Sequence, residues 1–199
     1  ANSYIIGESK VNFGGCDAIG ETLTADKTIE GDYCLATGKL DLAGHKLTIN
    51  GNLIQTGGEV CLNGGTLEVT GDYRIQSRTE NEDGTYKYGY STGFLTMTNE
   101  NDRVIVNGDF VTDSSVNHEE KLTAGIMTIG GNFTQLNSNN GRYNFAANEN
   151  HKVVLSGNTV QNISFAEPSY SKLANIEINN KNFVVFKSDY NKLKSYYKK

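Results

Sequence analysis

The sequence predicts an all-β protein, a single-stranded parallel β-helix whose coils are roughly triangular and about 20 residues long. The first observation is a motif of two apolar residues around one outward residue, then Gly, then Asp or Asn, then a bulky apolar residue, at residues 47–53 and again at 67–73. The second observation is the spacing of the glycine in this motif, which recurs at intervals of 20, 20, 37, 23 and 26 residues. These anchor glycines are Gly31, Gly51, Gly71, Gly108, Gly131 and Gly157.

Each coil is expected to place one pair of aliphatic residues in a shared interior. The pairs precede the anchor glycines and are Leu47/Ile49, Leu67/Val69, Val104/Val106, Met127/Ile129 and Val153/Leu155. A strand rises about 3.3 Å per residue, so a coil of this length has a perimeter of about 66 Å, enough for three short sides. Parallel crossovers are nearly always right-handed, and we expect the same hand here.

The ends of the chain are less regular than its middle. Residues 1–30 are interpreted as an N-terminal cap with short strands at 4–7 and 11–14, residues 31–180 as the repeats, and residues 181–199 as a C-terminal cap or tail. A last apolar strand is predicted at 183–186. The lysine- and tyrosine-rich segment after it could form a short helix beginning at Ser188 or Asp189, or a basic tail.

Three polar stretches interrupt the repeats, at residues 78–92, 113–121 and 137–142. The first lies between Gly71 and Gly93, if Gly93 takes the place that Gly58 has in the preceding coil. Gly125 is assigned to the same place one coil later, which gives a second insertion of about ten residues. Insertions that collect on one edge of a repeat array often form its binding surface, although surface loops also tolerate insertions at little cost.

Residues suited to recognition are found in all three stretches. Aromatic rings presented beside charged and amide groups can stack on sugars or enter a protein interface. Alternatively, the tyrosines belong to a hairpin that packs on the wall of the solenoid. The candidate binding residues are Arg78, Asp83, Tyr86, Tyr88, Tyr90, Asn117, His118 and Arg142.

The sequence contains no recognisable motif for catalysis, cofactor binding or metal binding. We therefore predict no catalytic residues, no metal ligands and no cofactor. The Asp or Asn after each anchor glycine is interpreted as turn chemistry that can stack in a ladder. An enzyme that cleaves polysaccharides with carboxylates from the loops is the second hypothesis, because Glu119 and Glu120 could face Glu82 and Asp83.

The charge and hydrophobicity of the chain limit the classes of partner that it can bind. The net charge of -5 argues against binding to nucleic acid, and no apolar run is long enough to span a bilayer. Cys16 and Cys34 flank the first coil and could form a disulfide, or all three cysteines could be buried thiols. Alternation along the strand places Cys61 outward between Val60 and Leu62.

The late segment departs from the basic coil and carries a resemblance to a known group of proteins. It reads His151-Lys152-Val153-Val154-Leu155-Ser156-Gly157, then Gln161, Ile163 and Phe165, then Leu173, Ile176 and Ile178. Together with the repeated strand pairs, it resembles adhesin-type modules of large secreted or surface-anchored bacterial proteins of the Firmicutes. This resemblance covers most of residues 40–180 and transfers no catalytic residue.

The resemblance implies a secreted or cell-surface location and a binding or scaffolding role. The sequence as a whole is therefore interpreted as a non-enzymatic module that recognises a glycan or a host or bacterial surface protein through loops on one edge. Neighbouring domains of a longer chain are further candidate partners. A passive spacer is the third hypothesis.

Overall fold

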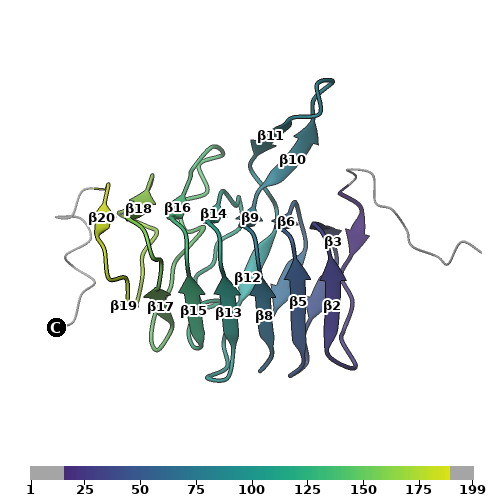
Figure 1. Cartoon of the computed structure of the whole chain (residues 1–199), viewed down its shortest axis with the longest axis horizontal. Helices are drawn as coiled ribbons and strands as arrows, with labels where there is room; N and C mark the ends of the chain where they lie inside the picture. Colours follow the sequence, from purple (N-terminus) through teal and green to yellow (C-terminus); the bar gives the residue numbers. More distant parts are fainter. Residues whose placement is uncertain (1–15, 189–199) are drawn as a thin grey trace, which may run out of the picture.

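The computed structural model describes residues 16–188, which form an all-β fold dominated by parallel sheets (Figure 1). The predicted fold class is confirmed at this level, since these residues contain strands and turns but no helix. Accordingly, this part of the chain offers no long apolar helix that could cross a bilayer. The strands predicted at 4–7 and 11–14, and the segment 189–199, lie outside the described residues.

The strands form two long parallel sheets, one short parallel sheet and one hairpin. The eight-stranded sheet contains, in spatial order, β1 (Ala18–Ile19), β3 (Tyr33–Thr37), β6 (Leu53–Gln55), β9 (Tyr73–Ile75), β14 (Phe110–Thr112), β16 (Phe133–Gln135), β18 (Gln161–Phe165) and β20 (Val184–Phe186). The seven-stranded sheet contains β2 (Lys27–Glu30), β5 (Lys46–Asn50), β8 (Thr66–Val69), β13 (Arg103–Val106), β15 (Ile126–Ile129), β17 (Lys152–Leu155) and β19 (Asn175–Ile178). The three-stranded sheet contains β4 (Lys39–Asp41), β7 (Glu59–Cys61) and β12 (Phe94–Thr96), and the antiparallel hairpin is β10 (Ser77–Glu80) with β11 (Tyr86–Gly89).

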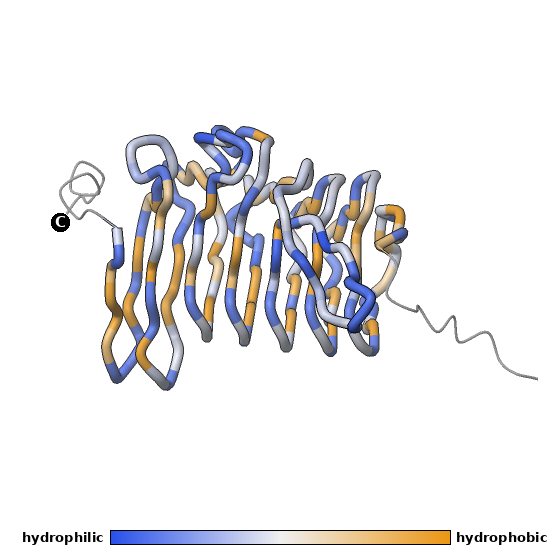
Figure 2. The backbone as a smooth tube through the Cα atoms, turned by 90° about the horizontal axis from the view of Figure 1, so that it is seen from above, coloured by the Kyte–Doolittle hydropathy of each residue, from blue (hydrophilic) through white to orange (hydrophobic). Residues whose placement is uncertain are grey.

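The chain visits the sheets in a repeating order. From β2 to β7 it passes twice through the seven-stranded, the eight-stranded and the three-stranded sheet, and each return adds a strand beside the previous one. Beyond β12 it alternates between the two long sheets, and isolated bridges such as Met97 with Leu122 continue the line of the three-stranded sheet. Figure 2 shows hydrophobic and hydrophilic residues alternating along these segments, as expected for strands with one face on a core.

The apolar pairs predicted from the sequence form two continuous columns in the seven-stranded sheet. Parallel pairing places Ile49 beside Val69, Val69 beside Val106, and so on along the sheet. The same registers align the other member of each pair. The prediction is confirmed, because every member is buried in one core cluster: Leu47, Ile49, Leu67, Val69, Val104, Val106, Met127, Ile129, Val153 and Leu155.

An aromatic stack occupies the interior behind the eight-stranded sheet. The rings of Tyr73 and Phe110 have centroids 5.4 Å apart, as do those of Phe110 and Phe133. Phe133 also contacts Phe145 at 4.9 Å and Phe165 at 5.1 Å. The bulky residues that follow three of the Gly-Asx steps, Tyr73, Phe110 and Phe133, are therefore core residues, and these contacts add to the burial of the rings.

The Asx residues form the ladder that turn chemistry predicts. The side-chain oxygen of Asp32 accepts a hydrogen bond from the backbone N–H of Asn52 at 2.9 Å, and Asn52 does the same for Asp72 at 2.8 Å. The series continues through Asp109 to Asn132, and its last member is Asn162, which follows Gln161 and not the anchor Gly157. Each repeat thus satisfies a backbone donor of the next one, which fixes the register at this corner.

The anchor glycines are required because neighbouring repeats approach each other closely at that corner. A Cβ atom on Gly51 would lie 2.4 Å from the carbonyl carbon of Gly31, which is far inside van der Waals contact. A Cβ on Gly131 would meet the same atom of Gly108 at 2.5 Å. The glycine that marks the repeat in the sequence therefore marks backbone contact between repeats.

The structure shows which cysteines are paired. Cys16 and Cys34 form a disulfide, one of the two alternatives left by the sequence. Cys61 is a free thiol outside the core cluster, consistent with alternation, but it is buried because Asp41 and Thr96 flank it in the three-stranded sheet. Burial raises the pKa of the Cys61 thiol, which keeps it protonated.

One assignment of the repeat register from the sequence is wrong. Gly93 does occupy the position of Gly58, since Phe94 pairs with Glu59. Gly125, however, immediately precedes β15 and lies at the next corner, beside Asp102. The second insertion is therefore about three residues rather than ten, which is the amount by which the interval of 23 from Gly108 to Gly131 exceeds 20.

Candidate functional site

Three longer segments leave one edge of the eight-stranded sheet. They follow β9, β14 and β16, which are neighbours in the sheet and run parallel, so their carboxyl ends lie side by side. The segments also bond to one another: Ser91 N–H donates to Asp113 O at 2.8 Å, and Ser138 N–H donates to the Asp113 carboxylate at 2.9 Å. The predicted clustering of the three stretches on one edge is thus found in the topology.

The first segment is a hairpin that projects from the body of the protein (Figure 1). We call residues 77–90, with β10 and β11, the tyrosine arm. Its turn is closed by a hydrogen bond from Gly84 N–H to Asn81 O at 3.0 Å, and Gly84 has a φ of 78°. Tyr86, Tyr88 and Tyr90 are 39%, 37% and 47% exposed, so all three rings are accessible to a partner.

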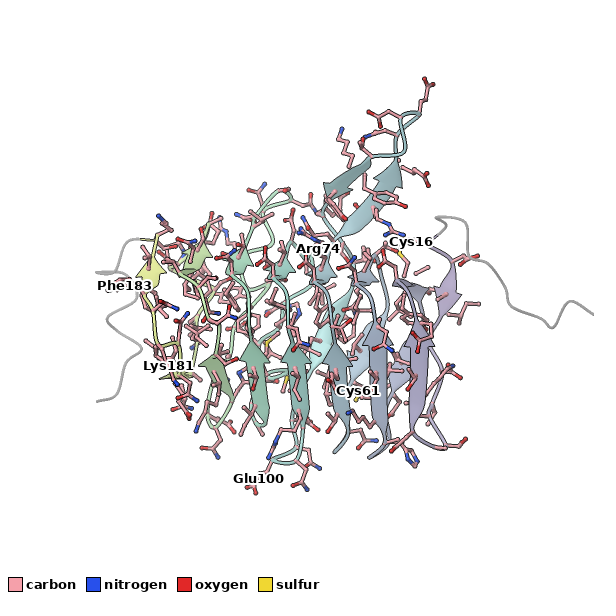
Figure 3. All side chains as sticks on the ribbon, in the orientation of Figure 1. Cys16, Cys61, Arg74, Glu100, Lys181 and Phe183 are labelled. Atoms are coloured by element: carbon pink, nitrogen blue, oxygen red, sulfur yellow. A yellow bond between two sulfur atoms is a disulfide. The ribbon has the colours of Figure 1, made fainter. Side chains whose placement is uncertain are left out.

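Two arginines hold the arm to the body. The guanidinium of Arg78 lies 4.2 Å from the ring centroid of Tyr86, and that of Arg74 lies 4.8 Å from the ring centroid of Tyr88. Arg78 also forms an ion pair of 3.1 Å with Asp32. Figure 3 shows Arg74 at the base of the arm. Tyr88 therefore rests on an arginine of β9, and Tyr86 on an arginine of the arm that is itself paired with the body, while all three tyrosines still present part of each ring to solvent.

Arg74 reaches the Asx ladder in the same way as Arg78. Its Nη2 atom lies 2.8 Å from Asp72 Oδ2, while the other oxygen of Asp72 accepts a bond from the N–H of Asp109. Two chains of contacts thus run in parallel, from a ladder aspartate through an arginine to a tyrosine. Such contacts restrict the tyrosine rings before any partner binds, which lowers the entropic cost of recognition.

Asp83 is a turn residue of the arm. Its carboxylate accepts hydrogen bonds from the N–H and the hydroxyl of Thr85, at 2.9 and 2.5 Å. The hydroxyl bond and then the backbone bond lower the pKa of Asp83. The carboxylate is fully exposed, but its observed role is to close the arm's turn.

His118 does not lie on the surface, as a binding residue would have to. Its ring is fully buried: Nε2 accepts from the N–H of Leu95 at 3.2 Å, and Nδ1 lies 3.2 Å from the carbonyl of Val116. These partners select the neutral tautomer with the proton on Nδ1. Desolvation lowers the pKa of His118 to about 3. His118 therefore anchors the second segment to the core and is not available to a ligand.

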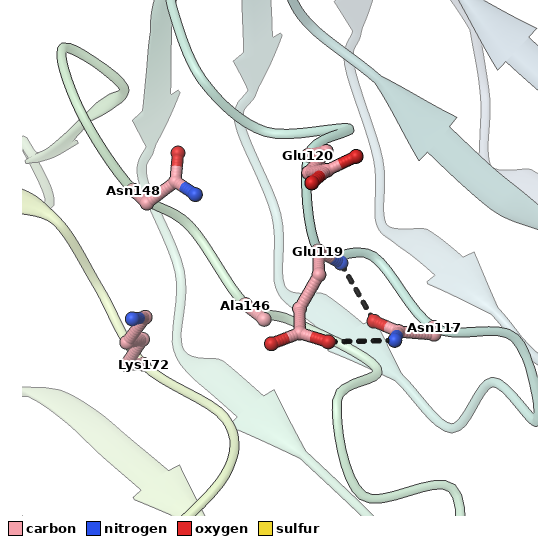
Figure 4. Close-up of a pocket in the computed structure, with 6 residues that line it drawn as sticks. All are labelled: Asn117, Glu119, Glu120, Ala146, Asn148 and Lys172. Atoms are coloured by element: carbon pink, nitrogen blue, oxygen red, sulfur yellow. Dashed lines mark hydrogen bonds between the residues drawn. The ribbon is translucent and has the colours of Figure 1, made fainter.

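Asn117 lies beside an open pocket of about 400 Å³ (Figure 4). The lining residues come from the segments after β14, β16 and β18, and are Asn117, Glu119, Glu120, Ala146, Asn148 and Lys172. Asn117 and Glu119 bond reciprocally: Nδ2 donates to the carboxylate at 2.8 Å, and Oδ1 accepts from Glu119 N–H at 2.7 Å. This pocket brings together groups from three successive repeats.

Arg142, the candidate from the third stretch, contacts the next repeat. Its guanidinium lies 5.0 Å from the ring centroid of Tyr170, and its carbonyl accepts a bond from the Ser171 hydroxyl. The eight predicted residues thus divide into an arm group, a buried histidine, a pocket residue and this exposed arginine. Sequence reasoning missed Arg74, Asn148 and Lys172, because their neighbours here are distant in the sequence.

The described residues contain no group of three or more His, Cys, Asp or Glu side chains arranged to hold a metal ion. Comparison with known proteins found no matching family model, no similar curated protein and no similar solved structure.

Proposed function

We propose that the three sheets are the sides of a right-handed, single-stranded parallel β-helix with a roughly triangular section. The repeated order of sheet visits supports this, as does the single core cluster that receives residues from all three sheets. A coil that advances by one strand at each return would give the observed parallel registers. Right-handedness follows from the general preference of parallel crossovers.

The proposed function is recognition of a glycan or a surface protein by a module of a secreted or cell-surface bacterial protein. The observation that carries it is the tyrosine arm, with three rings more than a third exposed on a projecting hairpin. A β-helix provides a rigid body from which such an arm can project. The disulfide between Cys16 and Cys34 favours an oxidising location, and the adhesin resemblance of the sequence points the same way.

The test is a variant with Tyr86, Tyr88 and Tyr90 all replaced by Ala, assayed on a glycan array and by pull-down with extracts of cell surfaces. We expect unchanged circular dichroism and loss of the wild-type hits. A matched control is Thr79→Ala with Lys87→Ala, a pair of arm residues on the opposite face of the hairpin from Tyr86 and Tyr88. Hits that survive the tyrosine substitutions would contradict the proposal, and wild-type protein without any hits would favour a passive spacer.

A second function, cleavage of polysaccharides, is favoured by one feature, the presence of Glu119 and Glu120 in the same pocket. Paired carboxylates can serve as acid and base in glycoside hydrolysis. A screen for release of reducing ends or unsaturated sugars tests it. Activity that Glu119→Gln abolishes would replace the binding proposal with the enzymatic one.

A further inference from the structure

The pocket formed by the segments after β14, β16 and β18 is a separate surface from the tyrosine arm, since no arm residue lines it. It lies beyond β12, where isolated bridges continue the line of the three-stranded sheet, and the bridged residues Ala146 and Lys172 both line it. Its volume of about 400 Å³ is within the range of small-molecule sites, about 300 to 1,000 Å³. The structure therefore offers enough room for a ligand of the size of one or two sugar rings.

The charges of the pocket are divided between two walls. Glu119 and Glu120 come from the segment after β14, and Lys172 lies across the pocket from them (Figure 4). With two carboxylates and one ammonium, the formal charge of the lining is -1 (two negative charges and one positive). Such a lining favours a ligand with a cationic group and disfavours an anion.

Glu119 is oriented before a ligand arrives. Its reciprocal hydrogen bonds with Asn117 involve one carboxylate oxygen, Oε2, and the backbone N–H. The other oxygen, Oε1, remains able to accept bonds from an ammonium or hydroxyl group. Figure 4 shows this carboxylate directed into the pocket. A fixed acceptor of this kind costs little side-chain entropy on binding.

The remaining groups suit hydroxyls. Asn148 lines the pocket with an amide, and its amide oxygen has no hydrogen-bond partner among residues 16–188. Ala146 is the only apolar side chain in the lining of this pocket. Polar walls with both donors and acceptors match a ligand whose groups donate and accept, as hydroxyls do.

We propose that this pocket binds a small, hydroxyl-rich ligand that carries an ammonium group, which is the chemistry of an amino sugar. The ammonium lies against Glu119 and Glu120, and the hydroxyls bond to Asn148 and Lys172. The inference goes beyond the proposed function and does not depend on the arm. If the arm also binds a glycan, the pocket would select for a free amine within it.

The test measures binding of glucosamine, the probe, to the full chain by calorimetry and by saturation-transfer NMR. We expect saturable binding of glucosamine, and binding at least about tenfold weaker for N-acetylglucosamine, which lacks the charge. Equal affinity for the two sugars, or no saturable binding of glucosamine, would overturn the proposal. Equal affinity for ethylamine would overturn the part of it that concerns hydroxyls.

Variants separate the site from general charge effects. Glu119→Gln is expected to weaken glucosamine binding about tenfold, whereas Glu149→Gln, which removes the same charge from an exposed residue outside the pocket lining, leaves it unchanged. Equal losses in both would contradict a local site. The triple tyrosine variant should keep glucosamine binding, which distinguishes failure of this inference from failure of the proposed function.

Glu120 provides a second, independent variant. Its φ of 62° lies in the left-handed region, which Asn adopts more easily than Glu. Glu120→Asn is therefore expected to keep or raise the melting temperature while weakening glucosamine binding. A variant that binds glucosamine like the wild type would show that this carboxylate has no part in the site.

Discussion

The repeats before residue 77 and those after it share one interior but differ at one edge. The early repeats are 20 residues long and turn tightly between strands, whereas the repeat from Gly71 to Gly108 is 37 residues long and carries the tyrosine arm. In both regions the aliphatic columns and the Asx ladder keep their register. Pairing between repeats therefore fixes the body, and the corner after the eight-stranded sheet is free to acquire new segments.

The largest expected effect comes from the aromatic stack in the interior. Phe133 contacts the rings of Phe110, Phe145 and Phe165, and Phe133→Ala should lower the free energy of unfolding by about 3 to 5 kcal/mol. Tyr88→Ala in the arm, the matched aromatic truncation, should lower it by less than about 1 kcal/mol. Urea denaturation followed by circular dichroism measures both. Similar losses would mean that the arm is part of the folding core.

The disulfide concerns the first repeat alone. It closes a sequence separation of 18 residues, and its reduction should cost about 3 kcal/mol of stability through the larger entropy of the unfolded chain. Denaturation with and without a phosphine reductant checks this, and hydrogen exchange should show the loss concentrated at β1 and β3. A uniform loss along the chain would contradict the view that each repeat is stabilised mainly by its neighbours.

Acid should weaken the later repeats before the early ones. His118 and His151 are buried there, and desolvation lowers their pKa values to about 3 and about 4. The unfolded chain binds protons at these histidines below about pH 6.5 while the folded protein does not, so stability is complete above that pH and is lost as the pH falls towards 4.

At pH 5 the loss should be about 2 kcal/mol for each histidine. His151 has neither ring nitrogen hydrogen-bonded among the described residues and packs against Phe145, so His151→Phe should remove its share of the pH dependence. The slope of unfolding free energy against pH between 5 and 6.5 is the measurement. A slope that is the same in the variant would assign the acid sensitivity to other groups.

The smallest expected difference in stability is between substitution of an anchor glycine, Gly51, and substitution of the glycine in the turn of the arm, Gly84. Gly51→Ala should cost about 1 to 3 kcal/mol, because its Cβ would collide with the backbone of Gly31. Gly84→Ala at the tip of the arm meets no atom within 4 Å, and its cost of about 1 kcal/mol comes from the positive φ alone. Melting temperatures of the two variants compare them. A larger effect at Gly84 would contradict the close packing of repeats at the anchor glycine.

The features predicted correctly are those that repeat at short range. The aliphatic columns, the Asx ladder and the position of Gly93 all follow from a motif that recurs every 20 residues or so, and local alternation identifies the buried face. The site was predicted less well. Arg78 pairs with Asp32, 46 residues away, and no local pattern indicates such a contact.

His118 and Gly125 show why the remaining predictions failed. The sequence predicts His118 as a binding residue because it lies in the polar stretch 113–121, yet a single side chain that turns inward in a loop leaves no periodic signal. The spacing of the glycines predicts the wrong corner for Gly125, because glycine serves more than one corner of a repeat. The conformation of a loop depends on its tertiary contacts. The sequence predicts those contacts only where they follow the repeat.

The most direct test of the stacked-repeat account is a pair of distances along the outer face of the seven-stranded sheet. Thr28, Thr48 and Glu177 lie in one column of paired residues. With spin labels at these positions in a Cys61→Ser background, pulsed electron resonance should give about 29 Å between 28 and 177 and about 24 Å between 48 and 177, one strand spacing less. Equal distances, or a 48-to-177 distance greater than the other, would contradict it.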